Sequence, residues 1–175
     1  MKRLVYLALF MCISLIGCVN NSQTEGDTTF SISADTLQSY ILPDINGNIN
    51  DYEKLLSKEQ KELFSNHCIK FEKEYAIPIG MFSCDNIGDF NNFTQYADAV
   101  SEKWNGCKDN QGLIFVISNK LGEIRLISCP ATEAKFSDED FNYVINTIIF
   151  GEFRNNNFFE GLDKSLNYLG DKMKK

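Results

Sequence analysis

The stretch KDNQGLIFVISNKLGEIRLIS, residues 108–128, decides the fold of this chain. It contains two apolar runs, residues 112–118 and 123–128, which are separated by a turn that includes Gly122. Two runs of this composition around a glycine-containing turn are typical of a β-hairpin. The first run is almost wholly apolar, which predicts a strand that is buried on both faces in the middle of a sheet.

A strand and a helix are predicted directly before this hairpin. Residues 76–84 form an apolar run whose Pro78 must lie at the start or on an edge, because proline donates no hydrogen bond to a sheet. Residues 89–104 carry a helical stripe of large apolar side chains, which are Phe90, Phe93, Ala97, Val100 and Trp104. A strand, a helix and a strand of these lengths predict a right-handed crossover between two parallel strands.

Three more helices are expected around the sheet. One begins at Ser57, where a Ser-x-x-Gln pattern forms a capping box, and another begins at Ser137. Residues 150–157 are expected to break the second of these, and the third covers about residues 157–173. The pattern predicts an α/β fold, an α/β/α sandwich with a mixed sheet. This sheet combines one parallel βαβ crossover with an antiparallel hairpin and is flanked by about four helices.

The N-terminus predicts export and a lipid anchor. Lys2 and Arg3 precede an apolar run that is too short to span a membrane, as in a signal peptide. The run ends in LIGC, residues 15–18, which resembles the lipobox of bacterial lipoproteins. The resemblance implies cleavage before Cys18 and lipidation of that cysteine, with an ordinary secretory signal as the alternative. A lipid anchor of several chains holds a protein at a membrane without a spanning helix.

Three segments follow from this interpretation of the chain. Residues 1–17 are the lipoprotein signal peptide, and residues 18–41 are the lipidated cysteine and a flexible polar tether. Residues 42–175 form a single folded domain. We therefore expect the protein in a bacterial cell envelope, lipid-anchored to a membrane and facing the periplasm or the cell surface.

The net charge and the cysteine content limit the classes of function that the chain can have. The formal net charge changes from −7 to −9 on cleavage, because the signal removes Lys2 and Arg3 and no acidic residue. This acidity argues against binding to nucleic acid, whose phosphates require basic patches. Four cysteines remain besides Cys18, namely Cys68, Cys84, Cys107 and Cys129. They allow two disulfides in three connectivities, and buried free thiols are the alternative.

Several segments in a fixed order resemble the TPM domain family. They are INDYEKLLS at residues 49–57, the helical stripe that ends in Trp104, KDNQGLIFV at residues 108–116, and the FR…FFEGL pattern at residues 153–162. The resemblance extends from about Leu42 to the C-terminus. The chain departs from the family around the hairpin. The usual G-Y-G-L-E is replaced by CPATE at residues 129–133, so only the glutamate is retained, the loop between Trp104 and Asp109 is shortened, and Gln111 is inserted before Gly112.

The resemblance implies an exported or membrane-anchored domain. Plant relatives are linked to photosystem II repair with acid phosphatase activity, an animal relative is a receptor accessory protein, and some members bind calcium or magnesium. Our first hypothesis is a lipid-anchored envelope accessory domain that binds protein partners, with or without a divalent cation. The alternatives are a weak metal-dependent acid phosphatase and a purely structural envelope protein.

A candidate cation site lies at the open end of the hairpin. Asp109 precedes its first strand, whereas Glu133 and Asp138 follow its second strand, so these residues share one edge of the sheet. With the amide of Asn110 they offer the oxygen ligands that calcium and magnesium prefer. The alternative is that each has a local role in a turn, on the surface or at a helix terminus.

Other residues give little indication of catalysis. Asp51 and Asp85 fall at the opposite edge of the sheet, where we interpret Asp51 as structural and as ordering the loop before Ser57. His67 is expected on the flank of a helix rather than in a catalytic site. The sequence contains no G-x-S-x-G motif and no Walker loop, so catalytic residues stay unknown.

Overall fold

The computed structural model of the protein describes residues 42–104 and 106–174. The predicted signal peptide, Cys18 and the tether lie outside these residues, so the predictions for them are not tested. In the part of the chain that the structure describes, no helix combines the length and apolarity needed to cross a membrane.

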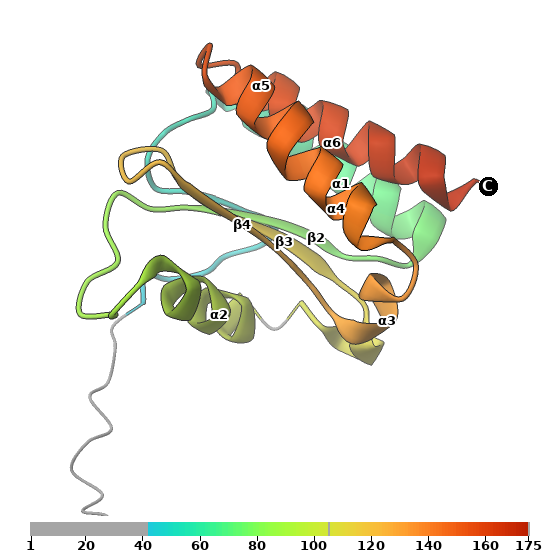
Figure 1. Ribbon diagram of the computed structural model, residues 1–175, viewed down its shortest axis with the longest axis horizontal. Helices are drawn as coiled ribbons and strands as arrows, with labels where there is room; N and C mark the ends of the chain where they lie inside the picture. Colours follow the sequence, from blue (N-terminus) through green and yellow to red (C-terminus); the bar gives the residue numbers. More distant parts are fainter. Residues whose placement is uncertain (1–41, 105, 175) are drawn as a thin grey trace, which may run out of the picture. The chain divides into compact units, whose positions relative to one another are not determined.

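The described chain is built on a four-stranded mixed sheet with the order β1-β2-β3-β4 (Figure 1). The strands are β1 (Ile49–Asp51), β2 (Ile79–Ser83), β3 (Leu113–Ser118) and β4 (Glu123–Ser128). The first three strands are parallel, and β4 is antiparallel to β3. All six residues of β3 are buried, as its apolar sequence predicts. The predicted fold class, the hairpin and the parallel pairing are therefore confirmed.

Helices cover both faces of this sheet (Figure 1). One face carries α1 (Lys58–Tyr75), α6 (Phe158–Met173) and a long helix made of α4 (Asp138–Tyr143), the π-helical η3 (Val144–Ile149) and α5 (Phe150–Phe153). The other face carries α2 (Phe93–Trp104). Two short elements, η2 (Lys108–Asn110) and α3 (Pro130–Glu133), flank the open end of the hairpin.

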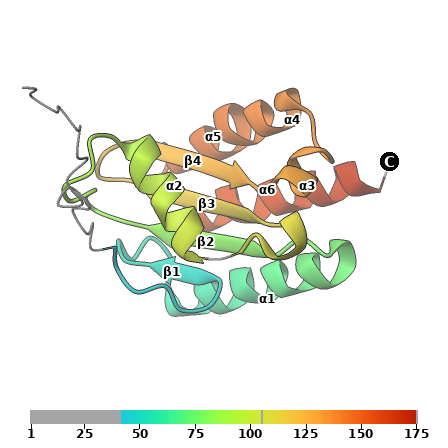
Figure 2. The same ribbon diagram turned by 90° about the horizontal axis from the view of Figure 1, so that it is seen from below.

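The two crossovers between parallel strands have opposite hands. Both step in the same direction across the sheet, yet α1 and α2 lie on opposite faces. Figure 2, in which α2 lies in front of the sheet, shows the β2–α2–β3 crossover as right-handed, as predicted. The β1–α1–β2 crossover is therefore left-handed, which is rare for such units.

Side chains alternate between two hydrophobic cores. Met81 and Phe115, which are register partners, face the core under α1 and α6, whereas Phe82 and Val116 face the core under α2. The side chains of β4 alternate in the same way, because Leu126 packs on the first core and Ile127 on the second.

Four local features of the structure were not predicted. The strand β1 is one, and the helix α3 at residues 130–133, with Pro130 in its first turn, is another, since this segment was expected to be a loop. Helix α2 begins at Phe93 rather than at residue 89, because the Asn92 side chain accepts a hydrogen bond from the Gln95 amide at 2.9 Å. The helix that begins after Ser137 continues through η3 to Phe153 instead of ending near residue 150.

Candidate functional site

The structure places the four residues of the predicted cation site around the open end of the hairpin. Asp109 and Asn110 lie in η2, both exposed and with positive φ angles of 54° and 61°. Glu133 ends α3 and Asp138 begins α4, and both side chains are exposed. Nowhere in residues 42–104 and 106–174 are three His, Cys, Asp or Glu side chains grouped so that they could hold a metal ion. Cation binding by these four residues stays a prediction.

The elements at this open end are joined by a disulfide. Cys107, just before η2, is bonded to Cys129, just before α3. The Gly112 amide, just before β3, donates a hydrogen bond to the buried Thr132 hydroxyl of α3 at 2.9 Å, which connects α3 to the start of the hairpin. Cys68 and Cys84 are free and buried. The structure thus selects one pairing from the alternatives that the sequence leaves open.

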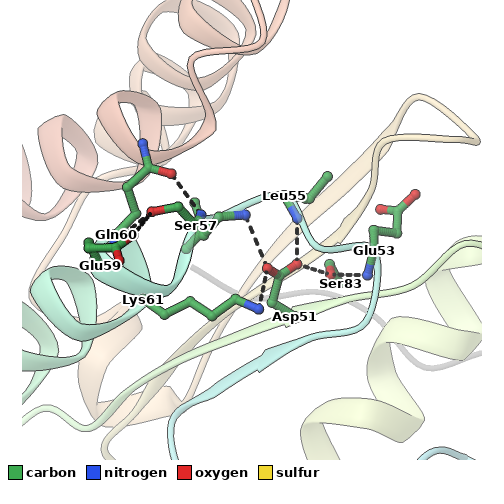
Figure 3. Close-up of polar contacts among 9 residues, drawn as sticks. Asp51, Glu53, Leu55, Ser57, Glu59, Gln60, Lys61 and Ser83 are labelled. Carbon is green, nitrogen blue, oxygen red and sulfur yellow. Dashed lines mark hydrogen bonds and ion pairs between the residues drawn. The ribbon is translucent and has the colours of Figure 1, made fainter.

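A buried carboxylate organises the opposite edge of the sheet (Figure 3). Asp51, at the end of β1, accepts hydrogen bonds from the amides of Leu55 and Leu56 at 2.9 and 3.1 Å. The Ser83 hydroxyl donates to the same carboxylate at 2.8 Å, and Lys61 forms an ion pair with it at 3.0 Å. The interpretation of Asp51 as a structural residue that orders the loop before Ser57 is confirmed.

The Asp51 carboxylate is held in its charged form. Burial removes water from it and would raise its pKa, but hydrogen bonds from Leu55, Leu56, Ser83 and Lys61 outweigh this effect and lower the pKa. The side chain of Asp51 has no exposed surface, so these partners replace the lost water.

The loop that Asp51 orders also supports the turn between β3 and β4. The Glu53 amide donates to the Ser83 hydroxyl at 3.0 Å. The Glu53 carboxylate accepts hydrogen bonds from the amides of Asn119 and Lys120 at 2.8 and 3.0 Å. Contacts with β2 on one side and with the β3–β4 turn on the other therefore fix the loop, which contains Tyr52.

Tyr52 forms one wall of a cavity at the carboxyl ends of β1 and β2. Its ring lies 5.5 Å from the ring of Phe82, and its hydroxyl donates to the Asp44 carbonyl. The cavity has a volume of about 270 Å³. Its other walls are Pro43, Cys84, the loop of residues 85–90 and Tyr96. Ligands of α/β proteins bind preferentially outside the carboxyl ends of the strands, so this cavity is the best candidate site.

The loop of residues 85–90 has a defined shape. The Asn86 side chain accepts a hydrogen bond from the Gly88 amide at 3.0 Å, and the Phe90 amide donates to the Ile87 carbonyl at 3.2 Å. Gly88 has a φ of +54°, a conformation that glycine adopts without strain. The carboxylates of Asp85 and Asp89 are therefore presented at the rim of the cavity from an ordered loop, and both residues are exposed.

Two ionisable groups at the floor of the cavity are held protonated. Burial raises the pKa of the Cys84 thiol to about 11, although a hydrogen bond with Tyr96 acts in the opposite direction. Burial and the neighbouring Cys84 raise the pKa of the Tyr96 hydroxyl. Neither group is an activated nucleophile at neutral pH, because nucleophilic attack by cysteine requires the thiolate.

His67 lies away from this cavity. Its Nδ1 atom lies 2.6 Å from a carboxylate oxygen of Asp163 in α6, and the two residues join α1 to α6. This position on a helix flank agrees with the sequence-based expectation.

The sequence placed Asp51 and Asp85 at this edge but did not reveal the cavity. The sequence did contain information that could have indicated the cavity. Parallel strands bring their carboxyl ends to one edge of the sheet, and Tyr52 and Cys84 directly follow the ends of β1 and β2. Tyr96 was not predicted as a site residue, because it is not among the residues of the apolar stripe and helical periodicity does not show which strand end a helix covers.

A family described as TPM domain matches residues 49–172. No functionally curated protein matches the chain.

Three solved structures are similar in fold. The N-terminal domain of a protein from P. gingivalis has a TM-score of 0.63 and 20% identity, with 72% of this chain and 81% of that chain covered. The BA42 protein from the psychrophilic bacterium Bizionia argentinensis has a TM-score of 0.58 and 17% identity, with coverages of 70% and 83%. The N-terminal domain of the cg2496 protein from Corynebacterium glutamicum has a TM-score of 0.57 and 11% identity, with coverages of 77% and 88%. At such identities the likeness concerns the fold alone.

Proposed function

Because the chain belongs to the TPM domain family, we propose that it is a lipid-anchored accessory domain of a bacterial cell envelope that binds a protein partner. Function within a shared fold depends on the site, so the proposal rests on the cavity beside Tyr52. The observation that carries it is the combination of an ordered aromatic cavity with a thiol and a phenol that stay protonated.

This combination favours binding over catalysis. A phosphatase requires either an activated nucleophile or a metal-bound water. Cys84 and Tyr96 are the groups at the cavity floor that could attack a substrate, and burial raises the pKa of each. Exposed aromatic side chains such as Tyr52, of which 48% is accessible, are instead typical anchors in protein interfaces.

The disulfide between Cys107 and Cys129 supports the envelope location. Disulfides form and persist outside the reducing cytosol, which agrees with export through the predicted signal of residues 1–17. In this proposal Cys18 carries the lipid, and residues 18–41 connect it to the domain.

Lipid anchoring predicts that Cys18→Ser releases the protein from membranes. Without the acyl chains, membrane affinity is lost, because the anchor depends on buried hydrocarbon. Fractionation of cells that express the full chain measures the distribution, with Cys68→Ser as a control that leaves the anchor intact. A Cys18→Ser protein that still sediments with membranes would refute lipidation.

Partner binding predicts that Tyr52→Ala lowers the amount of a co-purified envelope partner by about tenfold, as for an aromatic interface anchor. After chemical cross-linking in cells, the tagged full chain is purified and its adducts are quantified. The matched control is Tyr143→Ala, which removes a similarly exposed tyrosine, 45% accessible, from α4. Equal recovery with both variants would contradict a role for the cavity, and an absence of any specific adduct with the unaltered chain would contradict partner binding.

The proposal includes a divalent cation at the open end of the hairpin. Calcium at about 1 mM, in the range of extracellular modules, is expected to shift the amide resonances of Asp109, Asn110, Glu133 and Asp138 together. Magnesium is titrated in parallel. The variant Asp109→Asn is expected to weaken these shifts, and Asp98→Asn on α2 is its charge-matched control, which is expected to retain them. Unchanged resonances at these four residues would remove the cation from the proposal.

A further inference from the structure

We propose that the cavity beside Tyr52 receives a single basic side chain, an arginine in preference to a lysine, from the protein partner. This inference rests on the proposed partner-binding function and specifies its chemistry. It is carried by the aromatic walls of the cavity, the charge at its rim and its size.

Aromatic rings surround the cavity. The rings of Phe90 and Tyr96 lie 5.2 Å apart in an edge-to-face arrangement, and Tyr96 lies 6.3 Å from Phe82. Phe82 in turn supports the ring of Tyr52 on the other wall. Aromatic faces attract cations, and the attraction grows when the cation is removed from water. Such walls favour a guanidinium, which stacks on aromatic rings better than an ammonium does.

The charge at the rim is complementary to a cation. Asp85 and Asp89 both line the cavity, and 62% of the Asp85 side chain is exposed. Asp85 accepts a hydrogen bond from Asn86 at 2.7 Å and lies 3.8 Å from the ammonium group of Lys120. The side chain of Lys120 is itself 66% exposed, and an ion pair this long and exposed contributes little. An incoming guanidinium can therefore displace it and bind the carboxylate through two parallel hydrogen bonds.

Lys103, a second cationic residue near the cavity, does not repel an incoming arginine. Lys103 donates to the backbone carbonyls of Leu42 and Pro43 at 2.9 and 2.8 Å, at the end of the cavity that Pro43 forms. Its charge is directed at these two carbonyl oxygens rather than at the carboxylates of Asp85 and Asp89. The whole chain carries a net charge of −7, which adds a long-range attraction for a basic partner.

The size of the cavity fits one side chain. Its volume of about 270 Å³ lies below the roughly 300 Å³ from which pockets for drug-sized molecules begin. One long side chain fits this volume, and its cationic tip would lie among residues that include Asp85 and Asp89. A bulky organic ligand would not be enclosed.

The test uses two tripeptides of nearly the same shape, one with a charged guanidinium and the other with a neutral urea in its place. Acetyl-Gly-Arg-Gly amide and its citrulline analogue are titrated into the full chain, purified in detergent micelles, while amide resonances are recorded. The arginine peptide is expected to shift the amides of Ile87, Gly88 and Asp89 and to bind about tenfold more tightly than the citrulline peptide. The double variant Asp85→Asn, Asp89→Asn is expected to remove this preference, whereas the control Asp98→Asn on α2 is expected to retain it.

Three results of the peptide titration would overturn the inference: equal binding of the two peptides, a preference that survives in the double variant, or no shift of the loop amides with the arginine peptide. A shift of the same amides by calcium at lower concentration than by the peptide would also overturn it, since the cavity would then be a metal site. Failure here is distinguishable from failure of the proposed function. Co-purification of a partner that depends on Tyr52 but not on Asp85 and Asp89 would sustain the function and reject the arginine.

Discussion

Asp51→Ala is expected to lower the free energy of unfolding by about 3 kcal/mol, the largest effect that we predict for a single side chain. Removing one partner of a buried ion pair costs roughly 3–5 kcal/mol, and the lower end applies because Lys61 is 35% exposed. The variant leaves the amides of Leu55 and Leu56 without their acceptors, and these groups lie in the loop that positions Tyr52. Urea denaturation of the purified chain measures the change.

Asp171→Ala is the matched control for this variant. Asp171 also forms an ion pair with a lysine, Lys174 at 3.2 Å, but 73% of its side chain is exposed. Its removal is expected to change the unfolding free energy by less than about 0.5 kcal/mol. Equal effects of the two substitutions would contradict the structural role that we assign to Asp51.

The same carboxylate makes stability depend on pH. Hydrogen bonds lower the pKa of Asp51 in the folded protein, so its contribution is fully present above the unfolded value of about 3.9. The contribution is lost as the pH falls from that value through the folded pKa. Asp140, whose pKa is lowered by Lys172, acts in the same direction. Unfolding measured between about pH 5 and pH 2 should therefore show a shallower decline in Asp51→Ala than in the unaltered chain.

Loss of the Cys107–Cys129 disulfide is expected to destabilise the domain by roughly 3 kcal/mol. The bond closes a loop between residues that are 22 positions apart, and its removal gives the unfolded chain the corresponding entropy. For a domain of this size the midpoint of thermal unfolding should fall by roughly 10 °C on addition of reductant.

The double variant Cys107→Ser, Cys129→Ser is the control for this effect. It should start from the lower midpoint and show no further response to reductant, because Cys68 and Cys84 are free thiols in the folded protein. An unaltered chain whose midpoint does not respond to complete reduction would contradict the stabilising role of the bond.

Local sequence patterns predict much of this fold. The uninterrupted apolar run of β3 predicts a central strand, and the Ser57 pattern predicts the start of α1, where the capping box is formed. The strand β1 was not predicted because it has only three residues, two of which are polar. It becomes a strand only by pairing with β2, which is a tertiary effect. The π-helical segment η3 was missed because its apolar residues also fit an ordinary helical period.

The candidate site was less predictable than the fold. Sequence topology brings Asp51 and Asp85 to the same edge, but the cavity exists because Tyr52 and Tyr96, far apart in the chain, both pack near Phe82. Periodicity cannot show such a meeting of side chains. The pairing of Cys107 with Cys129 could not be predicted either. Four cysteines allow three connectivities, and their spacing in the sequence does not distinguish these.

The central claim, that the domain binds a partner through the cavity beside Tyr52, is tested most directly by photo-cross-linking in living cells. The photoreactive amino acid p-benzoylphenylalanine replaces Ile87 at the rim of the cavity or, as a control, Leu63, which is 58% exposed on α1. The account predicts a discrete adduct with an envelope protein from position 87 and none from position 63. An adduct from position 63 alone, or no adduct from position 87, would contradict it.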